Sequence, residues 1–458
     1  MKNDIKYIVA GIVLAAFSFV GCSNLQEDDF FGESAALRIV KFNKELQARL
    51  VEQSSNGKYG WCVQYFVGSD IKGYNLFASF GADGSVKFAG NHPYLRGGNA
   101  NKYTECVSSY EMLREDGPVL AFNTWNDVLT VFVDPVDPSS APDKLVDDGV
   151  GMSGDNNFVF QGYEGNNILF HGQRHAASIR FVPCDRPWED YINDVEAFKK
   201  RISNSTMNSY YVINKQDTMF FSGLSTGMAS YVERLVNPLQ VSTYPCLFGL
   251  DGFRLKSKLT MGETKSQNFV LSSEGDCLYN EDKSVKVVPT WDYYVNECSS
   301  LWRITNESFT EQQSNLYEKM VDEVKKVNDK WVLDSIAIGR RPETVYSETK
   351  YFPALVLCIH GPKKMGKTPM YYPYVNMGIY KPSAGVLKFE AWQKSAPANA
   401  HMELFAATNL KPLLEQFATS IYGTYNMDVN DAFRPTYVVL NPAEGGNALK
   451  LNLKAIVN

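Results

Sequence analysis

Apolar residues recur along this chain at two different spacings, and each spacing predicts a different element. Residues 34–51, 192–202 and 308–328 carry apolar side chains every three or four positions, which is the period of an amphipathic helix. The third stretch begins with Ser308-Phe309-Thr310-Glu311, which fits a capping box. A further helix is expected near residues 413–421.

Between these helices the pattern changes to short runs rich in β-branched and aromatic residues, separated by turns of Gly, Asp and Asn. The runs between residues 60 and 183 predict an antiparallel meander that closes into a barrel or sandwich. Trp61, Phe80, Phe122 and Phe132 are expected to point into its core. The expected strands are residues 61–66, 74–80, 86–88, 106–112, 119–122, 128–133, 158–160, 168–170 and 179–182.

Strand-like runs return in the second half of the chain. Residues 219–221, 253–259 and 268–271 predict a second sheet or an extension of the first. More strands are expected at residues 331–338, 354–360, 374–380, 386–392, 437–440 and 449–456. The fold class is therefore mainly β with a few α-helices, a β-rich α+β protein. A barrel-like N-terminal domain of antiparallel strands is followed by a second strand-rich domain.

The expected domain organisation follows from these elements and from the start of the chain. It comprises a lipoprotein signal peptide (1–21), a flexible acidic tether (22–33), a helix with the antiparallel meander (34–184), a helix with the second sheet or extension (185–300) and a C-terminal α+β domain (301–458).

Composition excludes several classes of protein. The chain has 458 residues, enough for two or three domains, and its 44% apolar and 21% charged residues are typical of a globular protein. A disordered chain and a multi-span membrane protein do not fit these values. The net charge of -6 is mild and is not segregated into blocks, so no nucleic-acid partner is expected.

The first residues resemble the export signal of a bacterial lipoprotein. Lys2 and Lys6 flank the start of a short apolar run, residues 7–20, which ends at Gly21-Cys22. Cys22 is the predicted lipidation residue, and acyl chains such as palmitate on it would anchor the protein stably. Phe19 departs from the usual leucine, and a buried N-terminal helix is the alternative. Acidic residues soon after Cys22 resemble a signal for the outer face of the outer membrane.

A series of short motifs runs along the N-terminal half of the chain. They are Glu27-Asp28-Asp29-Phe30, Ser34-Ala35-Ala36, Asn56-Gly57, Trp61, Gly73-Tyr74-Asn75, Asp83-Gly84, residues 116–123, residues 151–155, Gly172-Gln173-Arg174 and Trp188. In this order they resemble the Bacteroidetes lipoproteins described as domain of unknown function 4302. The resemblance is strong in the N-terminal half of the chain and weak in the C-terminal half. It implies a lipoprotein that often accompanies a TonB-dependent importer of the outer membrane and its lipoprotein lid, and it brings no established catalytic residues.

Two glycine-containing motifs could carry chemistry. Residues 361–368 fit the phosphate-binding pattern GxxxxGKT, but Pro369 and Pro373 follow where a helix should begin, so a basic hairpin tip is expected and no nucleotide. Residues 223–227 fit the nucleophile elbow GxSxG, which leaves a serine hydrolase using Ser225 as an alternative function. Against it, the surrounding pattern lacks the alternating strands and helices of the hydrolase fold.

Metal and disulfide chemistry have little support in the sequence. His171 and His175 lie in a stretch that predicts a hairpin, and the acidic residues 147–157 lack the ligand order of a calcium loop. No metal or cofactor is expected. The seven cysteines other than Cys22 contain no CxxC pair, and most are expected to be small buried hydrophobes.

The candidate ligand-binding residues are Tyr371, Tyr372, Tyr374 and Lys364, which form an aromatic and basic cluster expected to be exposed. Aromatic rings bind sugars and flat ligands by stacking, although tyrosines in strands are also common in cores. We therefore expect a surface lipoprotein that binds a glycan or peptide as an accessory of nutrient uptake, and not an enzyme. A structural or adhesive surface protein is the other alternative.

Overall fold

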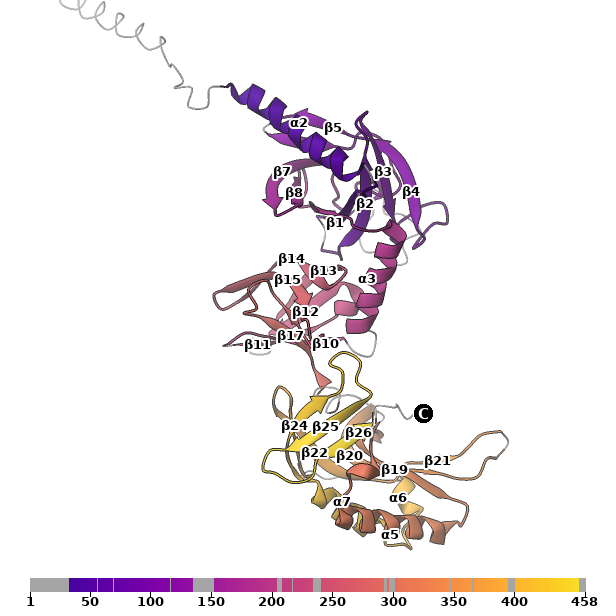
Figure 1. Ribbon diagram of the computed structural model, residues 1–458. Helices are drawn as coiled ribbons and strands as arrows, with labels where there is room; N and C mark the ends of the chain where they lie inside the picture. Colours follow the sequence, from indigo (N-terminus) through magenta and orange to yellow (C-terminus); the bar gives the residue numbers. More distant parts are fainter. Residues whose placement is uncertain are drawn as a thin grey trace, which may run out of the picture. The chain divides into compact units, whose positions relative to one another are not determined.

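The described residues fall into two compact units. Unit 1 consists of residues up to 69 together with 74–188, and unit 2 consists of residues 70–73 and those from 189 onward. Figure 1 shows the elements of each unit. No helix within the described ranges is long and apolar enough to cross a membrane. The computed structural model describes residues 33–55, 57–68, 70–115, 117–134, 152–203, 208–215, 217–233, 240–291, 295, 301–345, 348–364, 366–393 and 400–452.

Unit 1 contains one helix and one antiparallel sheet of nine strands, in the order β4-β3-β2-β1-β9-β8-β7-β6-β5. Helix α2 (Ala35–Gln53) is capped by the side chain of Ser34, and the indole of Trp61 donates a hydrogen bond to its Leu50 carbonyl (3.0 Å). The strands are β1 (Trp61–Phe66), β2 (Tyr74–Phe80), β3 (Ser85–Gly90), β4 (Thr104–Ser109), β5 (Glu111–Arg114), β6 (Pro118–Ala121), β7 (Asn157–Glu164), β8 (Asn167–Gly172) and β9 (Ser178–Pro183).

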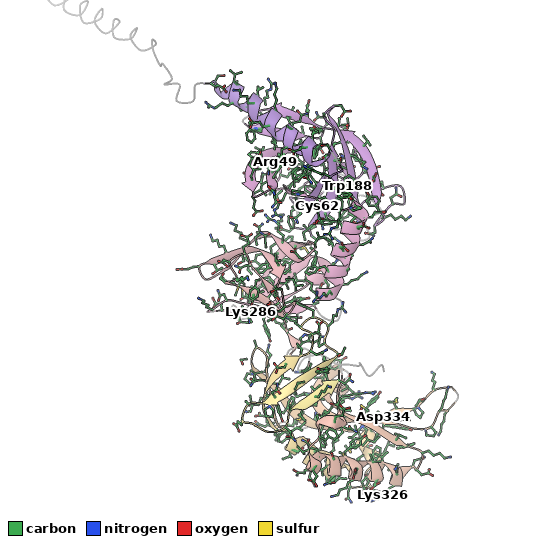
Figure 2. The ribbon with its side chains drawn as sticks, in the orientation of Figure 1. Arg49, Cys62, Trp188, Lys286, Lys326 and Asp334 are labelled. Carbon is green, nitrogen blue, oxygen red and sulfur yellow. The ribbon has the colours of Figure 1, made fainter. Side chains whose placement is uncertain are left out.

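The core of unit 1 confirms the predicted inward aromatics. Trp61, Phe80, Phe122 and Phe132 are each at most 3% exposed. Cys62 on β1 is fully buried in the same unit (Figure 2). The predicted meander is therefore a sheet with a packed aromatic interior.

Two predicted strands of unit 1 are wrong in detail. Residues 128–133 form a turn and a 3-10 helix, η1 (Thr130–Phe132), because the side chain of Asn126 accepts from the Leu129 N–H (2.6 Å) while the Asn126 N–H donates to Thr130 (3.0 Å). Such local bonds compete with strand pairing. Residues 106–112 form parts of two strands, β4 and β5, separated at Tyr110, whose N–H donates to Gly84 instead.

The first part of unit 2 is a closed barrel of eight antiparallel strands, which is a second sheet and not an extension of the first. Helix α3 (Trp188–Ile202) precedes it, with acidic residues in its first turn and basic residues in its last. This charge arrangement complements the helix dipole. The barrel strands are β10 (Ser209–Ile213), β11 (Thr218–Ser222), β12 (Met228–Glu233), β13 (Gln240–Phe248), β14 (Gly252–Met261), β15 (Thr264–Leu271), β16 (Leu278–Tyr279) and β17 (Lys286–Pro289).

The C-terminal part of unit 2 is a nine-stranded antiparallel sheet in the order β19-β18-β26-β25-β24-β23-β22-β20-β21. Strands β19 and β20 also pair with each other, which joins the first strand of this order to the last but one. The strands are β18 (Leu301–Ile304), β19 (Val332–Val345), β20 (Glu348–His360), β21 (Met370–Tyr371), β22 (Tyr374–Ser383), β23 (Val386–Ala391), β24 (Gly423–Val429), β25 (Tyr437–Pro442) and β26 (Leu449–Asn452).

Helices α5 (Glu311–Val327), α6 (Ala400–Glu403) and α7 (Leu410–Ser420) accompany this sheet. The predicted capping box is displaced by two residues. Thr310, and not Ser308, caps α5, and Gln313 completes the box. Both positions fit the pattern S/T-x-x-E/Q, but Ser308 ends a short 3-10 helix, η3 (Asn306–Ser308).

Candidate ligand-binding site

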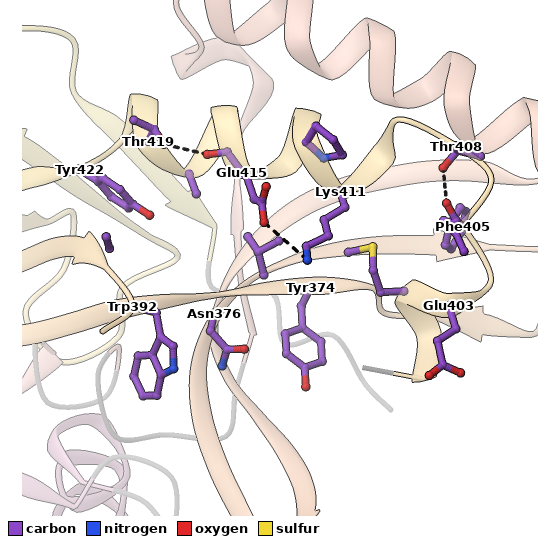
Figure 3. Close-up of a pocket in the computed structure, with 16 residues that line it drawn as sticks. Tyr374, Asn376, Trp392, Glu403, Phe405, Thr408, Lys411, Glu415, Thr419 and Tyr422 are labelled. Carbon is purple, nitrogen blue, oxygen red and sulfur yellow. Dashed lines mark hydrogen bonds and ion pairs between the residues drawn. The ribbon is translucent and has the colours of Figure 1, made fainter. Parts of the chain in front are cut away.

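The C-terminal sheet and helix α7 enclose a pocket of about 920 Å³. This volume is within the range of small-molecule sites. Aromatic side chains and charged groups both line it, as Figure 3 shows for Tyr374 and Trp392 and for Lys411 and Glu415. The lining residues are Tyr374, Val375, Asn376, Ala391, Trp392, Met402, Glu403, Phe405, Ala406, Thr408, Lys411, Pro412, Glu415, Ala418, Thr419 and Tyr422.

The pocket forms where strand β23 stops. The first pair between β22 and β23 is Met377 with Ala391, so no described residue of β23 pairs with the earlier part of β22. On its other side, this part of β22 pairs with β20, for example Asn376 with Ala354. Because side chains alternate along a strand, Val375 lies on one face and Tyr374 and Asn376 lie on the other. The pocket therefore reaches both faces of the sheet through this gap.

One wall of the pocket is a stripe on α7. Lys411 and Glu415 form an ion pair at 3.9 Å, and Thr419 donates a hydrogen bond to the Glu415 carbonyl (2.9 Å; Figure 3). These residues are four positions apart, so they share one helix face. Lys411 and Glu415 are exposed, which leaves both charges available to a bound molecule.

The opposite wall contains two buried hydrogen-bond donors without an acceptor. The side-chain nitrogens Asn376 Nδ2 and Trp392 Nε1 are both inaccessible to solvent and have no hydrogen-bond partner among the described residues. A buried donor left unpaired costs about 1–3 kcal/mol. Asn376 and Trp392 both line the pocket, so these unpaired donors lie within its wall.

The predicted aromatic and basic cluster is divided between different environments. Tyr374 lines the pocket and is 5% exposed, and Tyr372 is 7% exposed. Tyr371 stacks on Trp331 with 4.4 Å between the ring centroids. Lys364 is exposed on the loop before β21 and does not line the pocket. The expectation of an exposed cluster is therefore wrong for Tyr372 and Tyr374, because the sheet buries both rings.

Sequence reasoning missed Asn376, Lys411 and Glu415. A signal was present on α7, where Lys411, Glu415 and Thr419 place polar groups at a helical spacing. Asn376 gave no such signal, because its role depends on where the neighbouring strand β23 ends.

The glycine-rich loop at residues 361–368 is a hairpin, as predicted. It joins β20 to β21, and His360 pairs with Met370. Across the loop, Lys364 and Lys367 exchange backbone hydrogen bonds of 2.7 and 2.9 Å. A strand follows the loop where a phosphate-binding site would need a helix.

Ser225 lies in a single turn of 3-10 helix, η2 (Leu224–Thr226), between β11 and β12. Its N–H donates to Asn208 (2.8 Å). The histidines later in the chain have other contacts, since His360 bonds Asp334 (2.8 Å) and His401 accepts from the Tyr372 N–H (2.8 Å). Within the described residues, no histidine is hydrogen-bonded to Ser225.

The remaining candidates from the sequence are possible metal-binding residues and the cysteines. His171 lies on β8 and His175 in the turn before β9, in the predicted hairpin. No group of three or more metal-binding side chains occurs in the described part of the chain. The six described cysteines are free and five of them are buried, which confirms their hydrophobic character. Cys22, Cys298 and residues 135–151 lie outside the described residues.

The comparisons with known proteins concern mainly the first half of the chain. The model of the family described as a domain of unknown function (DUF4302) matches residues 27–273, more than half of the sequence. The chain belongs to this family. The DUF4302 match ends after β15, so the pocket lies outside it.

Known proteins of established activity add no functional evidence. No curated protein matches the chain. Among solved structures, the DNA polymerase III subunit beta from Pseudomonas aeruginosa aligns with 91% of this chain and 97% of its own, at 9% identity. The TM-score of 0.12 is too low to support any argument about fold or function.

Proposed function

We propose that this protein is a lipid-anchored, surface-exposed binding protein of the bacterial outer membrane, which captures a small glycan or peptide for a nutrient importer. The pocket of about 920 Å³ with unpaired buried donors is the observation that carries the proposal. A packed core would not leave this space. In the arrangement proposed, the partners are a TonB-dependent importer and its lipoprotein lid.

Binding fits the residues of the pocket better than catalysis does. Its lining combines the rings of Tyr374 and Trp392 with the charges of Lys411 and Glu415. Rings supply stacking area, and a few polar groups fix the orientation of a ligand. No pair of a nucleophile and a histidine occurs among the lining residues. The hydrolase alternative depends on Ser225, which lies in the separate eight-stranded barrel.

Ligand capture is tested with Trp392→Ala. The purified full chain is screened by thermal shift against oligosaccharides and short peptides, and hits are measured by calorimetry. A bound ligand should raise the melting temperature of the wild type, and Trp392→Ala should weaken binding about 10-fold or more through loss of stacking and of the indole donor. Trp125→Ala, at an exposed tryptophan of unit 1, is the matched control. Equal binding by folded Trp392→Ala would contradict the proposed site.

The anchor is tested separately with Cys22→Ala. Because Gly21-Cys22 ends the apolar run of an export signal, the substitution should abolish incorporation of labelled palmitate and release the protein from the membrane fraction. Cys62→Ala, at a buried cysteine, should retain both the label and the membrane location. A Cys22→Ala protein that is fully processed and still membrane-bound would show that another segment anchors it.

A further inference from the structure

More unpaired donors lie on the same face of the sheet as Tyr374 and Asn376. The atoms Arg303 Nε, Arg341 Nε and the Tyr372 hydroxyl are buried and have no hydrogen-bond partner in the described chain. Together with Asn376 Nδ2 and Trp392 Nε1 they form the donor cluster, five groups that can all donate. Ordinary proteins leave few such groups unpaired, so a concentration of donors in one region is informative.

Strand register brings the donor cluster together. Arg303 pairs with Ala337, Ala337 with Val356, and Val356 with Tyr374, so these four residues form one row across four strands. The side chains in the middle of the row are small. Three strand spacings of about 4.8 Å put the ends of the row about 14 Å apart. Ala337 and Val356, between the two ends, are fully buried in one cluster with Tyr372 and Tyr374.

Arg341 contacts Tyr372 and is linked to Trp392 through Phe352. Its guanidinium carbon lies 4.8 Å from the centroid of the Tyr372 ring. Across the β19–β20 ladder Arg341 pairs with Phe352, whose ring meets Trp392 edge-on at 6.3 Å. Tyr372 and Tyr374 belong to one buried cluster with Cys358. Asn376 and Trp392 of the donor cluster line the pocket, and Arg341 is connected to Trp392 through these ring contacts.

No described carboxylate forms an ion pair with either arginine, although Asp334 is close enough to act on the same Cys358 and Tyr372 groups as they do. The nearby carboxylate of Asp334 (Figure 2) binds His360 at 2.8 Å, and Glu390 pairs with Lys388 at 2.6 Å. Burial raises the pKa of the Cys358 thiol to about 11, although the charges of Arg303 and Arg341 oppose this rise. Burial also raises the pKa of Tyr372. Both groups therefore stay neutral at pH 7 and supply no counter-charge.

Two half-buried guanidinium groups without an anion are costly to maintain. Resting on the proposed binding function, we propose that the donor cluster binds the carboxylate of an acidic ligand whose body occupies the pocket. Arg303 and Arg341 supply the charge, Tyr372 and Asn376 supply neutral donors, and Trp392 both donates and stacks. Arginine suits this role because its planar fork matches a carboxylate. The carboxylate belongs either to a uronic acid of a glycan or to the C-terminus of a peptide.

Calorimetry on the purified full chain distinguishes these sources. One arm compares oligogalacturonate with the corresponding neutral galactose oligosaccharide, and the other compares short peptides with free and amidated C-termini. In at least one arm the acidic form should bind at least about 10-fold more tightly than its neutral counterpart. The neutral form lacks the hydrogen bonds to a charged group, which are stronger than those between neutral groups. The preferred arm identifies the source of the carboxylate.

Arg341→Gln removes one charge and should abolish this preference for the acid. Arg340→Gln is the matched control, because Arg340 is adjacent in sequence and lies on the opposite face of β19. Arg341→Lys, which keeps the charge but loses the fork, should retain part of the preference. Circular dichroism establishes that each variant is folded. Should Arg341→Gln fail to fold, Arg303→Gln replaces it with the same expected loss.

The outcomes separate this inference from the proposed function. Equal binding of acidic and neutral ligands, lost in Trp392→Ala, would overturn the donor cluster as a carboxylate site while the binding function stands. The carboxylate site would also be overturned if folded Arg341→Gln and Arg303→Gln still preferred the acidic ligand as strongly as the wild type does. Absence of binding by every glycan and peptide would contradict the proposed function and the inference together.

Discussion

The sheet of unit 1 and the C-terminal sheet of unit 2 have nine antiparallel strands each, yet their faces are filled differently. In unit 1, aromatic rings pack on one another, as Phe132 does on Tyr65 (5.4 Å) and Tyr74 (4.9 Å). In the C-terminal sheet, small residues such as Ala337 and Ala354 occupy the middle of one face, and arginines lie around them. Rings fill the centre of the first face, whereas small residues lie at the centre of the second and are covered by Leu301, Tyr372 and Tyr374.

The two sheets can also be compared through one buried tyrosine from each. A buried hydroxyl needs a hydrogen-bond partner, because water does not reach it. Tyr65 in unit 1 has one, since its hydroxyl accepts from the Asp155 N–H (3.3 Å). Tyr372 in the C-terminal sheet has a buried hydroxyl with no hydrogen-bond partner in the described residues. The two tyrosines thus differ in whether the protein itself supplies that partner.

The largest expected effect is the loss of a core ring in unit 1. Phe132→Ala should lower the free energy of unfolding by about 3–5 kcal/mol, because it leaves a cavity among Tyr65 and Tyr74. Urea unfolding of the full chain, followed by far-UV circular dichroism, measures this loss. Trp392→Ala should cost clearly less, since its indole faces the pocket. Equal losses in the two variants would mean that the C-terminal face is a core like the first.

The second effect concerns pH, through the buried thiol of Cys358. Its pKa in the folded protein is about 11 against an ordinary value of 9.0. Between these values the folded state holds the proton while the unfolded state releases it, so stability is retained below pH 9 and falls above it. The slope is about 1.4 kcal/mol per pH unit for one group.

The test for Cys358 compares how the free energy of unfolding changes with pH in wild type and in Cys358→Ala. Wild type should lose about 1 kcal/mol more than Cys358→Ala between pH 9 and pH 10 in the unfolding of unit 2, because at pH 9 the unfolded thiol is already half ionised. Cys106→Ala, at a partly exposed cysteine of unit 1, should leave that difference unchanged. Parallel pH curves for wild type and Cys358→Ala would mean that the thiol ionises freely in the folded protein.

Much of this fold can be predicted from the sequence because the pattern of each strand is local. Trp61–Phe66 and Tyr74–Phe80 have the predicted bounds, since their apolar runs end in turns. The error at residues 128–133 arose from a single side chain, Asn126, whose hydrogen bonds outweigh the strand propensity of the residues after it. The local pattern therefore predicts most strands well, but it does not predict where the hydrogen bonds of one side chain prevent a strand from forming.

The pocket could not be predicted in the same way, because it depends on pairings between distant residues. Asn376 reaches it only because β23 ends at Ala391, and Arg341 meets Tyr372 across a closed set of strands. Strand register is set by the whole sheet and not by any one run of residues. The sequence predicts an exposed cluster at Tyr371, Tyr372 and Tyr374, whereas the structure buries the ring and the hydroxyl of Tyr372.

The smallest expected effect gives the sharpest test of the comparison, because two equivalent changes should differ in direction. Tyr65→Phe removes a hydroxyl that accepts a hydrogen bond, and should cost about 1 kcal/mol by leaving the Asp155 N–H unpaired. Tyr372→Phe removes a hydroxyl that has no partner among the described residues, so it should leave stability unchanged or raise it slightly. Each variant loses one oxygen and keeps its ring, so packing contributes little to the difference. Urea unfolding of the full chain measures the difference: the transition of unit 1 is followed for Tyr65→Phe and that of unit 2 for Tyr372→Phe. If Tyr372→Phe is destabilised as much as Tyr65→Phe in the absence of any ligand, the Tyr372 hydroxyl has a partner within the protein and belongs to the structure of the sheet rather than to a binding site.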